Sequence, residues 1–76
     1  MNKARREAIE KVTEGLTDLM GELESLKDEE QEYFDNMPEG LQSGEKGSAA
    51  EEAVSSLEEA IGNIESAIDG AGSAMG

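Results

Sequence analysis

The chain has 76 residues, with 19 acidic and six basic side chains and a formal net charge of −13. It contains no histidine and no cysteine, which excludes disulfides, imidazole or thiolate catalysis, and zinc bound through nitrogen or sulfur. The length allows one small domain, and the negative charge disfavours direct binding to nucleic acid or to an anionic membrane. No apolar run has the length of a membrane span, and no signal peptide is evident, so we expect a cytoplasmic protein.

Apolar residues in the first half of the chain recur at alternating steps of three and four. This row consists of Ile9, Val12, Leu16, Leu19, Leu23, Leu26, Glu30 and Tyr33, in which only Glu30 breaks the pattern. A second row with the same spacing consists of Val54, Leu57, Ile61, Ile64, Ile68, Ala71 and Met75. Such steps mark the a and d positions of a heptad. We therefore predict an all-α fold in which two helices, about 3–34 and about 48–70, form an antiparallel two-helix hairpin.

The residues between and after these rows indicate where the helices end. Residues 35–47 contain Pro38 and three glycines, which prevent one continuous helix and predict a loop. Ser48 followed by Glu51 matches a capping box, so the second helix is expected to begin there. Residues 71–76 are expected to fray, and the whole chain 1–76 is expected to form a single domain.

A single seam between two helices gives a small core for a chain of this length, which favours association. In the second predicted helix, alanines precede the a positions at every seventh residue and widen the apolar face; we call this the alanine row: Ala53, Ala60, Ala67 and Ala74. In the first helix Met20 and Phe34 widen the face on its other side. These faces predict a homodimer of hairpins forming a four-helix bundle. A monomeric hairpin, a larger or mixed assembly, and alanines chosen only for helix propensity remain alternatives.

Four basic residues lie at the start of the chain: Lys3, Arg5, Arg6 and Lys11. Residues 1–11 carry a net charge of +2, whereas the other 65 residues carry −15. Cations at a helix N-terminus oppose the helix dipole. One interpretation is structural, with the cations beside the C-terminus of the second helix and paired with Glu7 at i, i+4 spacing. The other is an anion site, in which the Arg5/Arg6 clusters of two chains in a dimer clamp a phosphate group, such as that of a nucleotide, or an acidic loop of a partner.

The segment before Pro38 combines the two aromatic residues with carboxylates. Its candidate partner-binding residues are Asp28, Glu29, Glu32, Tyr33, Phe34, Asp35, Met37 and Leu41. The apolar members either cap the open end of the bundle or anchor a basic protein surface that the carboxylates attract. The remaining carboxylates are either a solvated face or a mimic of nucleic-acid phosphates.

The segment from Lys27 to Glu39, followed by Leu41-Gln42, Ser43 and Glu45-Lys46-Gly47, resembles a group of small acidic proteins. These proteins are encoded by phages and prophages of Gram-positive and gut bacteria, and the resemblance spans nearly the full length. It implies a phage accessory protein that acts by binding, against a host protein or a defence component in the host cytoplasm.

We therefore predict a non-enzymatic acidic binding or inhibitor protein with no cofactor and no metal. The alternatives are an oligomer that sequesters a small anionic nucleotide at its basic ends, or a purely structural assembly protein.

Overall fold

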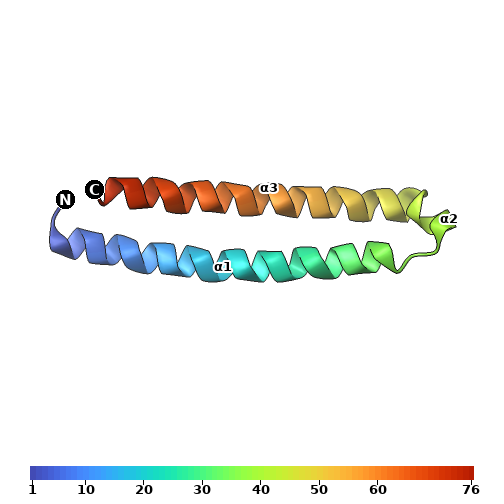
Figure 1. Ribbon diagram of the computed structural model, residues 1–76, viewed down its shortest axis with the longest axis horizontal. Coiled ribbons are helices and arrows are strands. Elements are labelled where there is room, and N and C mark those ends of the chain that lie inside the picture. The colour runs from blue at the N-terminus through green and yellow to red at the C-terminus, as the bar shows by residue number, and fades with distance from the viewer.

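A computed structural model describes all 76 residues, and every regular element in it is helical. Helix α1 spans Lys3–Asp35, the short α2 spans Glu39–Gln42, and α3 spans Glu45–Ala74. The two long helices lie side by side and run in opposite directions, with α2 at one end and both termini at the other (Figure 1). The all-α class is confirmed.

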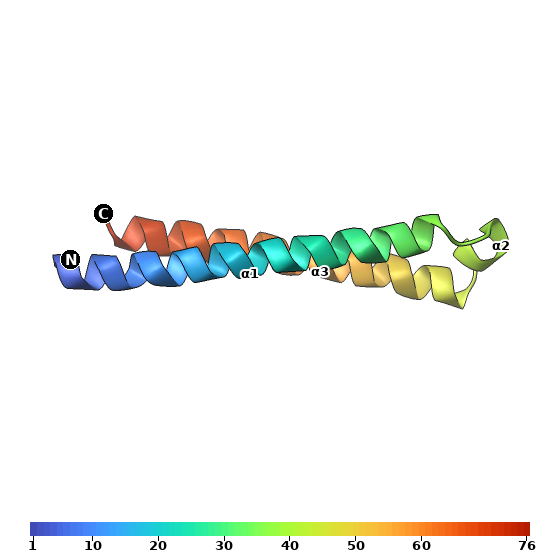
Figure 2. The same ribbon diagram turned by 90° about the horizontal axis from the view of Figure 1, so that it is seen from below.

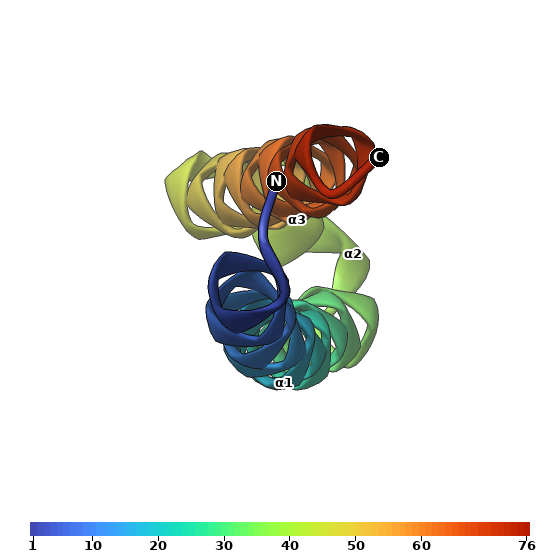
Figure 3. The same ribbon diagram turned by 90° about the vertical axis from the view of Figure 1, so that its left-hand side faces the viewer.

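The molecule is a thin rod. Its extents are 58 × 15 × 12 Å and its radius of gyration is 17.3 Å, against about 11 Å for a compact domain of this length. The two long helices cross at a shallow angle (Figure 2). Seen along the rod, α1 and α3 form a single layer that no third long helix covers (Figure 3). The only buried apolar side chains are those of Ala50 and Val54.

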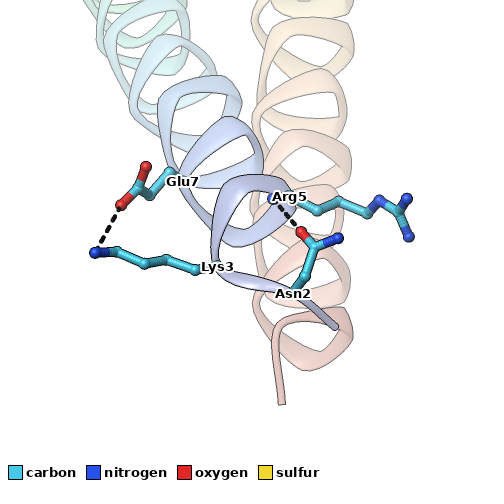
Figure 4. Close-up of polar contacts among 4 residues, drawn as sticks. All are labelled: Asn2, Lys3, Arg5 and Glu7. Carbon is cyan, nitrogen blue, oxygen red and sulfur yellow. Dashed lines mark hydrogen bonds and ion pairs between the residues drawn. The ribbon is translucent and has the colours of Figure 1, made fainter.

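Helix α1 begins where the sequence predicts, because Asn2 caps it. The side-chain oxygen of Asn2 accepts a hydrogen bond from the backbone N–H of Arg5 at 2.8 Å (Figure 4). This bond satisfies one of the amide groups that a helix leaves without an internal partner. At its other end α1 continues to Asp35, one residue beyond the predicted end, and stops at Asn36 before Pro38.

Helix α3 is longer than predicted at both ends. It starts at Glu45 after Gly44, and Ser48 lies inside it, where the Ser48 backbone N–H donates to the carbonyl of Gly44. The predicted capping box at Ser48 is therefore wrong. The tail predicted to fray is also helical as far as Ala74. The half-buried positions of Ala71 and Met75 give the physical reason, because they continue the apolar row of α3 to the end of the rod.

The face of α1 turned toward α3 differs from the predicted one. Its less exposed positions, which we call the inner row, are Ile9, Thr13, Leu16, Met20, Leu23, Lys27, Glu30 and Phe34. Half of the predicted seam is instead exposed, and we call these four residues the outer stripe: Val12, Leu19, Leu26 and Tyr33. The apolar surface of α1 spans three adjacent heptad rows, of which one neighbouring helix covers two. In α3, by contrast, every position of the predicted row is buried or half-buried.

Neither long helix contains a stretch that is apolar and long enough to cross a membrane.

Candidate protein-binding site

The end of the rod at α2 holds an open hollow of about 330 Å³. Three of its lining residues are apolar or aromatic and the others are polar or restrict the backbone; together they are Tyr33, Asn36, Met37, Pro38, Leu41 and Lys46. Tyr33 comes from the last turns of α1 and Leu41 from α2, so the chain reversal itself forms the hollow. The side chains of Tyr33 and Leu41 are about half exposed, at 52% and 49%.

Two close contacts of Gln42 fix the shape of this end. Its side-chain amide donates to the backbone carbonyl of Phe34 at 3.0 Å, which ties α2 to the last turn of α1. On its other side, Gly47 of α3 is buried against the Gln42 backbone, where a Cβ would overlap the Gln42 carbonyl. The reversal is therefore held by backbone contacts and one side-chain hydrogen bond, rather than by a large core.

The structure divides the four predicted apolar anchors into two groups. Tyr33, Met37 and Leu41 line the hollow and are exposed or half-exposed. Phe34 lies instead on the inner row, half-buried against α3. A side chain packed between the two helices is a structural residue, so the surface available to a partner consists of the other three.

The four predicted carboxylates lie in the last turns of α1 and are all exposed. Asp28 is 3.4 Å from the Lys27 ammonium, and Asp35 accepts a hydrogen bond from the Gln31 side chain at 3.0 Å. Glu29 and Glu32 make no ion pair and no side-chain hydrogen bond. Their charge is therefore free to act on an approaching partner.

The predicted basic residues gather at the opposite end of the rod. Lys3 pairs with Glu7 at 3.9 Å, and both side chains are largely exposed (Figure 4). The predicted pair between Glu7 and Lys11 does not form, and neither Arg5 nor Arg6 has a carboxylate within ion-pair distance. The guanidinium of Arg6 lies beside Gly76. The cations therefore lie at the end of the rod that holds the C-terminus of α3, as one of the two interpretations expects, but of the predicted ion pairs only Lys3–Glu7 forms.

The sequence pattern did not predict that Lys46 and Asn36 are parts of the hollow. Both lie in the predicted loop, and only the short helix α2 brings Lys46 back against Tyr33 and Met37. Lys46 therefore places one cation in the lining of the hollow, which contains no carboxylate.

A second hollow of about 470 Å³ lies on α3, and its lining is entirely polar: Ser48, Glu51, Glu52, Ser55 and Ser56. The structure contains no group of three or more carboxylates arranged to hold a metal ion.

Comparisons with protein-family models, with curated proteins and with solved structures gave no match to the chain.

Proposed function

We propose that this chain is a non-enzymatic protein-binding module whose α2 end binds a basic surface on another protein. The observation that supports this most directly is the open hollow that Tyr33, Met37 and Leu41 line, together with the unpaired carboxylates Glu29 and Glu32 in the part of α1 that carries Tyr33. The hollow would accept an apolar side chain of the target, while Glu29 and Glu32 attract the cations around that side chain.

The two parts of the site contribute in different ways. A few side chains in well-packed pockets, often tyrosine or tryptophan, supply most of the binding energy at protein interfaces, where methionine is also enriched. Charges at the rim mainly raise the rate of association, and this effect weakens as salt screens it. The module would therefore reach a basic target quickly and hold it through Tyr33, Met37 and Leu41.

Assembly is a further part of the proposal. The antiparallel pair of helices would act as a helical hairpin that associates with a second copy into a four-helix bundle, because its buried core is so small. The resemblance to small acidic phage proteins supports a target in a bacterial host cytoplasm, either a host protein or a defence component.

A defined peptide tests the site. The probe is a lysine-rich peptide with one central leucine, compared with the same peptide carrying glycine at the centre. Tyr33 is the only tyrosine and the chain has no tryptophan, so Tyr33 fluorescence reports binding at the hollow. We expect the leucine peptide to bind more tightly. We also expect the double variant Glu29→Lys/Glu32→Lys to slow association and flatten its salt dependence.

The matched control is Glu58→Lys/Glu59→Lys, which makes the same charge change at two exposed positions of α3. Equal slowing by both double variants would show that only net charge matters. Equal affinity for the leucine and glycine peptides would overturn the role of the hollow.

Two other functions stay open to test. The unpaired Arg5 and Arg6 favour capture of a small anion, and titration calorimetry with ATP measures it directly. A structural assembly protein would instead continue to self-associate as its concentration rises and would bind neither probe.

A further inference from the structure

The outer stripe is an apolar surface that nothing in the chain covers. Its four residues, Val12, Leu19, Leu26 and Tyr33, recur at every seventh position along α1 and are between 52% and 60% exposed. A seven-residue repeat of large apolar side chains is the pattern with which one helix packs along another. Scattered surface leucines need no explanation, but a continuous row of four along the helix does.

The outer stripe and the alanine row lie on the same side of the rod. With Ile9 of α1 and Val54 of α3 at a positions of the heptad, the outer stripe occupies the d positions of α1, beside the contact with α3. The alanine row occupies the g positions of α3, which also lie beside this contact. Because the helices are right-handed and antiparallel, these two flanks point in the same direction. Ala53 and Ala60 are half-buried there, and Ala67 and Ala74 are exposed. Large side chains on one helix and small ones on the other therefore form one broad apolar face.

The exposed area matches what a second copy would remove. The chain exposes 5390 Å², whereas a compact monomer of the same mass exposes about 4,500 Å². The surplus of about 900 Å² is close to the ~800 Å² that each partner buries in a stable protein–protein interface. A second copy also supplies the same seven-residue repeat, so the two faces fit each other along their whole length.

The charges of the rod decide the direction in which two copies pair. Residues 1–11 carry a net charge of +2, whereas residues 25–55, around α2, carry nine carboxylates and two lysines. Copies placed with the same ends together would bring two strongly acidic α2 ends into contact. Copies placed head to tail instead set the unpaired Arg5 and Arg6 of each chain beside the acidic α2 end of the other.

We infer that two copies pair head to tail through this face, with the outer stripes of the two α1 helices against each other. Full overlap of the stripe with itself sets Leu19 beside Leu26 of the partner copy and Val12 beside Tyr33 of the partner copy. The two alanine rows then face each other, and their small side chains let the α3 helices approach closely. The result is an isologous dimer with four antiparallel helices.

This pairing also affects the hollow, a step that rests on the proposed function. Head-to-tail pairing places the basic residues 1–11 of one copy beside the hollow and the carboxylates of the other. A basic target would then have to displace the N-terminal segment of the second copy. Self-association and target binding therefore compete for Tyr33.

The face is tested by sedimentation equilibrium on the full chain. We expect the parent to be dimeric at micromolar concentration, and the double variant Leu19→Glu/Leu26→Glu to raise the dimer dissociation constant by more than about 100-fold. The control Thr17→Glu/Gln31→Glu adds the same two charges at exposed positions away from the stripe and should change it little. A monomeric parent, or equal effects of both double variants, would overturn the inference.

The direction is tested without disturbing the face. A spin label at Glu10→Cys is the only thiol label in the chain, because there is no native cysteine. Head-to-tail pairing predicts a label separation of about 40 Å, whereas pairing with the same ends together predicts about 15–25 Å. The shorter distance would overturn the direction, even if Leu19→Glu/Leu26→Glu fails to fold.

The same material separates the two proposals. Peptide binding at Tyr33 by a chain that stays monomeric would overturn the dimer and leave the proposed binding site at the α2 end standing. If the parent is a head-to-tail dimer and the separated Leu19→Glu/Leu26→Glu chain does not bind the leucine peptide, the dimer stands and the proposed binding site is overturned.

Discussion

The backbone of Gly47 in α3 packs directly on the backbone of Gln42 in α2, at the one point where the chain reversal is tightest. Gly47 is buried, and the position that its Cβ would occupy is already filled by the Gln42 carbonyl. Backbone atoms cannot move aside as a flexible side chain can, so this contact requires glycine.

We therefore expect Gly47→Ala to lower the free energy of unfolding by about 1–3 kcal/mol, because α2 and α3 must separate to admit the methyl group. Thermal unfolding followed by circular dichroism at a fixed chain concentration measures the change. The matched control is Gly62→Ala, where no atom outside the local helix lies within 4 Å of the added Cβ. There the better helix former should raise the free energy of unfolding by about 0.5–1 kcal/mol. Stabilisation by both substitutions would contradict the contact at Gln42.

The hydrogen bond from Gln42 to the Phe34 carbonyl gives a second prediction. Gln42→Ala should lower the free energy of unfolding by about 0.5–1.5 kcal/mol, since the bond is partly buried and closes the end of α1. Urea unfolding measures this. Gln31→Ala removes a similar bond, to Asp35, at an exposed site and should have a smaller effect. An effect of Gln31→Ala as large as that of Gln42→Ala would show that this bond does not hold the reversal.

The rotation of α1 can be tested at Lys27, which lies on the inner row with its side chain only 28% exposed. Lys27 pairs with Asp28, but the Asp28 side chain is exposed to solvent, so the ion pair contributes little to stability. Lys27→Leu should raise the free energy of unfolding by about 1 kcal/mol, because leucine adds apolar contact with α3. Lys11→Leu makes the same change at an exposed position and should be neutral. The opposite ranking of the two variants would mean that α1 turns a different face to α3.

The cap at the start of α1 gives a fourth prediction. Asn2→Ala should lower the free energy of unfolding by about 1 kcal/mol, because the Arg5 amide loses the side-chain oxygen that accepts its hydrogen bond. Asn63→Ala, inside α3, should instead be neutral or slightly stabilising because alanine favours the helix. Amide hydrogen exchange in residues 3–8 is the measurement, and unchanged exchange would show that the cap does not hold the first turn.

The apolar pattern predicts α3 better than α1, and the reason is the number of apolar rows. In α3 one row of large side chains, from Val54 to Met75, has only alanines beside it, so a single rotation buries the large residues. In α1 the row of Ile9, Leu16 and Leu23 has the outer stripe on one side and the row with Met20 and Phe34 on the other. The sequence pattern allows either row to face α3, and only packing against α3 selects the one with Met20 and Phe34.

The α2 end shows a different limit of the sequence. The aromatic and acidic character of the segment before Pro38 could be recognised, but the hollow depends on a four-residue helix that returns Lys46 to Tyr33. Short helices have no periodicity to detect. The Ser48 capping box predicted the wrong start for α3, because serine and glutamate three residues apart also occur inside a helix, and here α3 already begins after Gly44.

Only two apolar side chains, those of Ala50 and Val54, are buried. So small a core affects the lifetime of the protein in a cell. A rod with so little interior opens often, and each opening exposes its backbone to proteases. Any association that covers the outer stripe suppresses that opening by mass action. We expect turnover to remove the unassociated chain first, so that the steady-state level of the protein follows the supply of whatever it binds.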